Sequence, residues 1–174
     1  TAIILNDMNY EYPELVHPKA RSGSTAPYVM FNGAEEAGVD AMAAMATFLA
    51  ERYSGTGHGT VSNWVIANEI NARSHWNYME YTDVYNYTKE YAQAFRVFYN
   101  AIKSVNASAE IYMPLDQTWN RNLNDRNYDA RDVLDNFNNI VKEKGNFVYH
   151  PEIFEHNRDI MLSGYWQTDK YFSE

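Results

Sequence analysis

Three short apolar runs of the chain each end in polar side chains that could carry out chemistry. These terminal pairs are Asn6–Asp7, Asn68–Glu69 and Asp116–Gln117. Acid/base cleavage of a glycosidic bond requires a carboxylic acid that a stiff element holds next to the leaving oxygen. Glu69 meets this requirement of position, and the amide of Asn68 could hydrogen-bond a sugar hydroxyl. Such a pair is also typical of an ordinary loop cap, so position alone leaves both interpretations open.

The segments that must position these pairs alternate between strands and helices. Apolar, strand-like runs predict strands at Ala2–Leu5, Val61–Ala67 and Ala109–Leu115. Apolar residues at three- and four-residue steps predict helices over 34–53, 84–105 and 130–145. Asp83 and Asp129 stand where the second and third helices need an N-cap. The turn-rich stretch 10–32 shows neither period and is expected to be a long loop.

Repeated strand–helix units predict a parallel sheet with right-handed crossovers, either an open doubly wound sheet or a closed barrel. No Gly-rich phosphate turn follows any of the three strands, which removes the main support for a nucleotide-binding fold. Enzymes with a β/α barrel place their chemistry at the C-terminal ends of the strands, where the polar pairs lie. We therefore expect an α/β fold that forms part of a (β/α)8 TIM barrel.

The composition excludes several classes of partner. The 174 residues carry a formal charge of −9 without any cluster of Lys or Arg, so a nucleic-acid backbone would be repelled. No apolar run approaches the roughly 20 residues that a membrane span needs. Cysteine is absent, and the histidines never show the i, i+4 spacing of a helical zinc motif. We expect neither a metal nor another cofactor.

Aromatic and polar side chains near the strand ends are candidates for binding a glycan. Trp76 follows Glu69 on the same predicted loop as Arg73 and Tyr78, and flat aromatic faces suit pyranose rings. The full set of candidate substrate-binding residues is Asn68, Trp76, Asp116, Trp119 and His150. For each of them, loop packing or a structural hydrogen bond is the competing interpretation.

The stretch Trp64–Glu69 resembles the Trp-x-x-x-Asn-Glu signature of clan A glycoside hydrolases. The wider stretch 2–146 resembles an uncharacterised bacterial family of TIM-barrel enzymes of this clan, through AIILND, HPKARSG, FLAERYSG, HGTVSNWVIANEINAR, KEYAQAFRVFYNAIKS and LDQTWNRN. The resemblance implies a retaining hydrolase of an oligosaccharide or polysaccharide, with Glu69 as acid/base and Asn68 in contact with the sugar. For the full-length protein we expect a secreted or cell-surface location.

The nucleophile of this chemistry has no candidate motif in the sequence. Retention requires a second carboxylate about 5 Å from the first, and the resemblance implies a Glu at the end of a seventh strand. The strands predicted here would be the third to the fifth, and a complete barrel takes about 250 residues. We therefore expect a barrel fragment that is inactive by itself. A non-catalytic glycan-binding or scaffold barrel is the alternative.

Residues 147–174 are expected to form a tail distinct from the barrel fragment over 1–146. A short stretch, His150–Phe172, resembles part of bacterial α-1,2-fucosyltransferases, chiefly in LSGYWQ and KYF. A transferase would need a nucleotide-sugar domain that the sequence does not show. An ordinary strand with aromatic packing is the alternative, and the tail could belong to a different gene.

Overall fold

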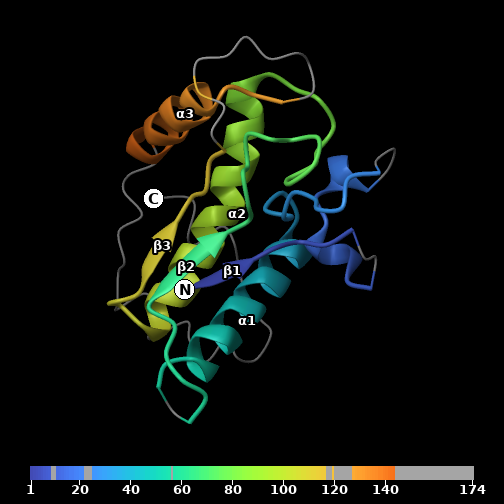
Figure 1. Cartoon of the computed structure of the whole chain (residues 1–174). Helices are drawn as coiled ribbons and strands as arrows, with labels where there is room; N and C mark the ends of the chain where they lie inside the picture. Colours follow the sequence, from blue (N-terminus) through green and yellow to red (C-terminus); the bar gives the residue numbers. More distant parts are fainter. Residues whose placement is uncertain (9–10, 22–24, 56, 117–118, 120–126, 144–174) are drawn as a thin grey trace.

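The computed structural model of the chain describes residues 1–8, 11–21, 25–55, 57–116, 119 and 127–143. Within these ranges strands and helices alternate along the chain (Figure 1). The elements are β1 (Ala2–Ile4), α1 (Glu36–Arg52), β2 (Asn63–Ile66), α2 (Val84–Val105), β3 (Glu110–Tyr112) and α3 (Ala130–Glu143). Each predicted strand and helix is present, although the strands are shorter than expected and the predicted end of α3 at Gly145 lies outside the described residues.

The three strands form one parallel sheet in the order β1-β2-β3. Ile4 of β1 lies opposite Ile66 of β2, and Trp64 of β2 lies opposite Ile111 of β3. The predicted parallel pairing of neighbours in chain order is therefore confirmed. Because all strands run the same way, their C-terminal ends meet at one edge of the sheet, which brings Asn6–Asp7, Asn68–Glu69 and Asp116 to a common side.

Among the described elements, helices cover one face of the sheet and leave the other face without a covering helix. α1 and α2 lie across one face, and α3 packs against α2 (Figure 1). Alternate strand residues point to opposite faces, and Ile4, Trp64 and Ile66 are buried with helix residues in one hydrophobic core. The residues between them point the other way: Ile3 is 57% exposed and Tyr112 44% exposed. Apolar side chains thus occupy both faces, as the sequence of a buried parallel strand predicts.

The sequence of α2 provides both an N-cap and a continuous apolar face, which together favour a helix at this place. Oδ1 of Asp83 accepts a hydrogen bond from the Asn86 N–H at 3.0 Å, which confirms the predicted N-cap. The predicted apolar face is buried throughout: Tyr87, Tyr91, Phe95, Phe98 and Ile102. This face supplies much of the core between α1 and α3.

The described parts of the stretch 10–32, residues 11–21 and 25–32, contain more regular structure than their composition indicated. They contain two 3₁₀ turns, Pro13–Leu15 and Pro18–Ala20. The backbone N–H groups of His17 and Asn32 donate to the carbonyls of Met30 and Leu15, both at 3.0 Å. These bonds join two parts of the stretch that are distant in sequence, so hydrophobic periodicity could not have revealed them.

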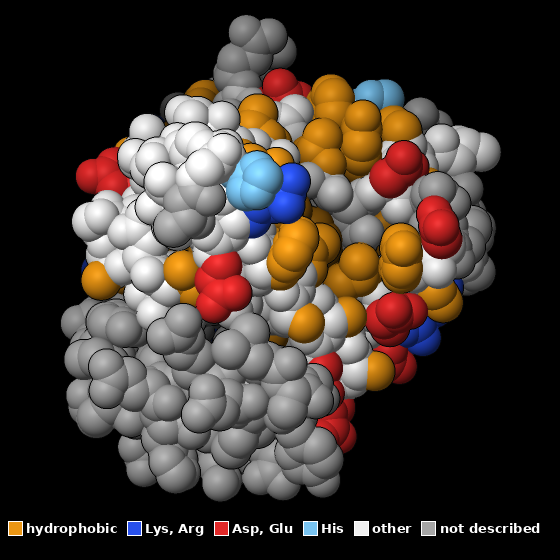
Figure 2. All heavy atoms as spheres, turned by 90° about the horizontal axis from the view of Figure 1, so that it is seen from below, with side chains coloured by type: hydrophobic (Ala, Val, Ile, Leu, Met, Phe, Trp, Pro, Cys, Tyr) orange, Lys and Arg blue, Asp and Glu red, His pale blue; other side chains and the backbone are white. Residues whose placement is uncertain are grey.

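The surface carries acidic and apolar side chains side by side. Seen from below, hydrophobic side chains gather on one side with acidic side chains between them (Figure 2), in keeping with the net charge of −9. No helix in the described ranges is both long and apolar enough to cross a membrane.

Candidate functional site

The chain leaves β2 through an unusual backbone turn that carries Glu69. Ala67 has a φ of 66° and Glu69 a φ of 39°, both in the left-handed region that residues with a Cβ rarely adopt. The Ala67 N–H still donates to the Ile4 carbonyl at 2.8 Å, so the turn begins directly from the sheet. Such strained backbone clusters at active sites and ligand clamps, where the surrounding structure holds it in place.

The side chains of Asn68 and Glu69 are half-buried at this turn. No hydrogen bond or ion pair joins the Glu69 carboxylate to any other described residue. A half-buried carboxylate without a structural partner at the C-terminal edge of a parallel sheet is available to a ligand. Glu69 therefore follows the C-terminal end of β2, as its place in the sequence predicted, and its catalytic role stays a prediction.

Asp116, predicted to bind substrate, has a structural partner. Pairing between the ends of β2 and β3 continues through the Ile70 N–H, which donates to the Pro114 carbonyl at 3.2 Å. Beyond it the Asn71 amide donates to Oδ1 of Asp116 at 2.7 Å. Asp116 thereby fixes the loop after Glu69 to the end of β3, which is the structural hydrogen bond that the sequence left open as its competing interpretation.

Trp76 belongs to a group of stacked aromatic rings. Its ring lies 5.0 Å from that of Tyr28, at 12° between the planes, and meets His75 edge-on at the same separation. Tyr78 holds the two segments together, because its N–H donates to the Tyr28 carbonyl and its carbonyl accepts from the Met30 N–H. Trp76 and Tyr28 remain half-exposed, so this pair presents an aromatic surface close in sequence to Glu69.

Arg73 is less suited to contact substrate than its place in the sequence indicated. Its side chain is 7% exposed and lies against the rings of Tyr78 and Tyr81, with 5.8 and 5.7 Å from the guanidinium carbon to each ring centre. Nη1 also donates to the Met79 carbonyl at 2.5 Å. These contacts hold the loop between Arg73 and Tyr81 in place through a buried side chain.

The remaining predicted binding residues are placed in part. Trp119 is 41% exposed, but most of its neighbours in sequence lie outside the described residues. His150 lies outside them as well. The structure thus brings Glu69, Asn68 and Asp116 to one sheet edge, with Trp76 on the loop that follows.

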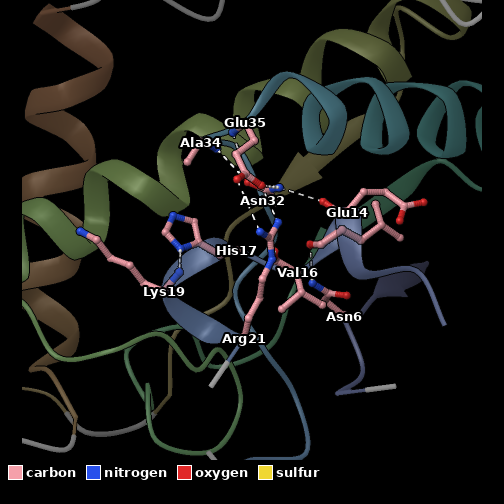
Figure 3. A network of polar contacts seen from close by, with 10 residues as sticks. Asn6, Glu14, Val16, His17, Lys19, Arg21, Asn32, Ala34 and Glu35 are labelled. Atoms are coloured by element: carbon pink, nitrogen blue, oxygen red, sulfur yellow. Dashed lines mark hydrogen bonds and ion pairs between the residues drawn. The ribbon is translucent and has the colours of Figure 1, made fainter. Parts of the chain in front are cut away.

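A polar network on the stretch before α1 was not predicted (Figure 3). Asn32 is fully buried, its Oδ1 accepts from the N–H groups of Ala34 and Glu35, and its amide donates to the Glu14 carbonyl at 2.8 Å. Arg21 pairs with Glu35 on the surface. Hydrogen bonds from Arg21 and Asn32 lower the pKa of Glu35. The network anchors the start of α1.

His17 forms a second buried contact, with α2. Its Nδ1 accepts a hydrogen bond from the Lys19 N–H at 3.1 Å, so in the neutral ring the proton is on Nε2. Nε2 lies 3.3 Å from Oε2 of Glu90. The hydrogen bond from His17 lowers the pKa of Glu90, against the opposing effect of burial. This pair ties the stretch 11–32 to α2.

The described residues contain no group of three or more side chains that could hold a metal ion.

Comparison with known proteins gives a family and no further match. No curated protein and no solved structure matches the chain. A family model, described as a family of unknown function (DUF5722), matches residues 1–174, including the stretch predicted to be a distinct tail. The chain belongs to this family.

Proposed function

We propose that the chain is the acid/base-bearing part of a retaining glycoside hydrolase built on a TIM barrel, and that Glu69 is its acid/base. The observation that carries the proposal is the position of Glu69. It stands at the C-terminal edge of a parallel sheet, on left-handed backbone, without a structural partner among the described residues. Barrel enzymes draw their catalytic residues from such strand ends.

The two faces of the sheet support the barrel part of the proposal. In a β/α barrel, helices cover the outside of the strands and side chains fill the inside. Here α1 and α2 cover one face, while Ile3 and Tyr112 project from the other. Apolar residues on an uncovered face are expected if further strands of a barrel enclose it.

Asn68 beside Glu69 and an aromatic pair that includes a residue of the following loop support a carbohydrate as the ligand. Asn68 offers an amide that can both donate to and accept from a hydroxyl group. The Tyr28–Trp76 pair offers an aromatic surface of the kind on which pyranose rings pack. The side chain of Asp116 is engaged by Asn71, which favours a nucleophile from another strand over one from β3.

The substitution Glu69→Gln in the full-length protein tests the proposal. It should nearly abolish cleavage of natural oligosaccharides, because their leaving groups need a proton. Aryl glycosides with good leaving groups should still form the glycosyl-enzyme, and azide should restore turnover by replacing the water that Glu69 would activate. Rates are measured on both substrates, with and without azide. Wild-type rates on both would remove Glu69 from the mechanism.

A glycan-binding barrel without catalysis is the second candidate. It is favoured by the lack of a second carboxylate paired with Glu69 within the described part of the chain. Under this alternative the full-length protein binds oligosaccharides but does not cleave them, whether or not Glu69 is changed. Binding measured by calorimetry beside the turnover assay separates the two functions.

A further inference from the structure

Two tyrosines of α2 reach the turn that carries Glu69. Tyr87 and Tyr91 are four residues apart on one face of the helix, and both are almost completely buried at 0% and 1% exposure. The Tyr91 hydroxyl donates to the Ile66 carbonyl at 2.8 Å. The Tyr87 hydroxyl lies 2.6 Å from the Ile70 carbonyl oxygen. The two phenols thus bind the two ends of the segment 66–70.

This segment contains both left-handed residues. Ala67 and Glu69 lie between the two carbonyls that the tyrosines bind. A strained conformation persists only where neighbouring groups hold it. Fixing the carbonyls at both ends restricts the backbone between them, and therefore the direction in which the Glu69 side chain leaves the turn.

The Tyr87 hydroxyl also fixes the far end of the following loop. It lies 2.9 Å from the carbonyl oxygen of Asn77 and accepts a hydrogen bond from the Asn77 amide, also at 2.9 Å. Asn77 is fully buried and one residue from Trp76. Burial raises the pKa of both phenols, so both hydroxyls keep the proton that they donate. One side chain therefore holds the turn at Glu69 and the loop that bears Trp76.

We propose that Tyr87 and Tyr91 are positioning residues that set the orientation of the Glu69 carboxylate from behind the sheet. The part of this inference that concerns catalysis rests on the proposed function. Neither hydroxyl faces the substrate side, since both are buried between α2 and the turn. Their effect on chemistry is exerted through the backbone of residues 66–70.

The conformational part is tested on the 174-residue chain with Tyr91→Phe, Tyr87→Phe and the control Tyr85→Phe. Each change removes one hydroxyl from α2, but Tyr85 is 42% exposed and does not reach the turn. Backbone and Cβ chemical shifts of Ala67 and Glu69 report left-handed backbone. They should move in the first two variants and stay unchanged in the third. Unchanged shifts in Tyr91→Phe and Tyr87→Phe would overturn the inference.

The catalytic part is tested on the full-length protein. Tyr91→Phe should lower kcat on a natural oligosaccharide by about tenfold to a hundredfold, as expected for a misplaced catalytic group, and leave KM nearly unchanged. The loss should be smaller on an aryl glycoside with a good leaving group, as in Glu69→Gln. A variant that is only less stable would lose activity equally on both substrates, and this result would refute the positioning role.

The outcomes separate this inference from the proposed function. If Glu69→Gln shows the leaving-group dependence and Tyr91→Phe does not, the inference fails and the proposed function stands. If Glu69→Gln behaves as wild type, the proposed function fails. The chemical shifts of Ala67 and Glu69 then decide alone whether the tyrosines hold the turn.

Discussion

Asn71 and Asp116 exchange two hydrogen bonds across neighbouring strand ends. The Asn71 amide donates to Oδ1 of Asp116 at 2.7 Å, and the Asp116 N–H donates to Oδ1 of Asn71 at 2.9 Å. Asn71 is fully buried, so water cannot readily replace either bond. Position 71 must both donate and accept, which an amide does and a carboxylate does not.

Replacing Asn71 by Asp is expected to destabilise the protein in a pH-dependent way. The new carboxylate faces the Asp116 carboxylate and lacks the N–H donor of the Asn71 amide. The loss of this hydrogen bond should lower the free energy of unfolding by about 1–3 kcal/mol at pH 7. Repulsion raises the folded-state pKa of the pair above its unfolded value, so acidification adds a proton and restores a donor. Urea unfolding at pH 7 and pH 4 measures the recovery, with Asn138→Asp on the exposed side of α3 as control. An equal loss at both pH values would contradict this account.

The His17–Glu90 pair predicts a loss of stability in acid. The folded-state pKa of Glu90 is lowered from its ordinary value of 4.5, first by the hydrogen bond from His17. Its stabilisation is therefore full above the unfolded pKa and is lost as the pH falls through the folded pKa. Glu90→Gln should cost about 1 kcal/mol at pH 7, and the difference from wild type should vanish in acid. Glu80→Gln, on an exposed side chain, is the control. A constant difference down to pH 3 would argue against the pair.

Gly38 in α1 is expected to resist substitution by alanine. A Cβ at this position would overlap the backbone oxygen and the amide of Asn32, which anchors the start of the helix. Helix propensity alone would make Gly38→Ala stabilising by about 1 kcal/mol, whereas overpacking should make it destabilising by about 1–3 kcal/mol. Thermal unfolding measures the sign, with Ala44→Gly as the propensity reference in the same helix. A rise in Tm for Gly38→Ala would refute the close approach.

The open sheet face predicts self-association of the isolated chain. Exposed apolar side chains such as Ile3 and Tyr112 favour contact with another molecule. Within the described part of the chain, β1 and β3 each also leave one edge unpaired. Ile3→Ser should shift sedimentation velocity profiles toward monomer. Phe48→Ser removes a residue of similar exposure, 58%, from α1 and should have little effect. A strictly monomeric wild-type chain would count against the uncovered face.

Local signals predicted the elements and their order well. The cap at Asp83 and the apolar face from Tyr87 to Ile102 each depend on residues a few positions apart, and both are found as expected. The strand order follows from short connections between strand–helix units. These features need only the sequence near each element.

Contacts between distant residues were not predictable in the same way. The Asn32 amide binds a carbonyl 18 positions away, and Asn71 binds a carboxylate 45 positions away. The backbone turn at the end of β2 involves only neighbouring residues, yet its conformation was not predictable either. Asn tolerates left-handed backbone better than most residues, yet it is Ala67 and Glu69, on either side of Asn68, that adopt it.

The hydroxyl contacts of α2 also determine how the candidate site can open. A surface loop commonly exchanges its amide protons through its own local opening. Tyrosine hydroxyls of α2 hold the segment 66–77 at the carbonyls of Ile66 and Ile70 and at the side-chain amide of Asn77, and α2 itself packs against both α1 and α3. The protected amides of this segment should therefore exchange with those of α2, as one cooperative unit, and the site should stay closed to local fluctuation until the core of the sheet opens.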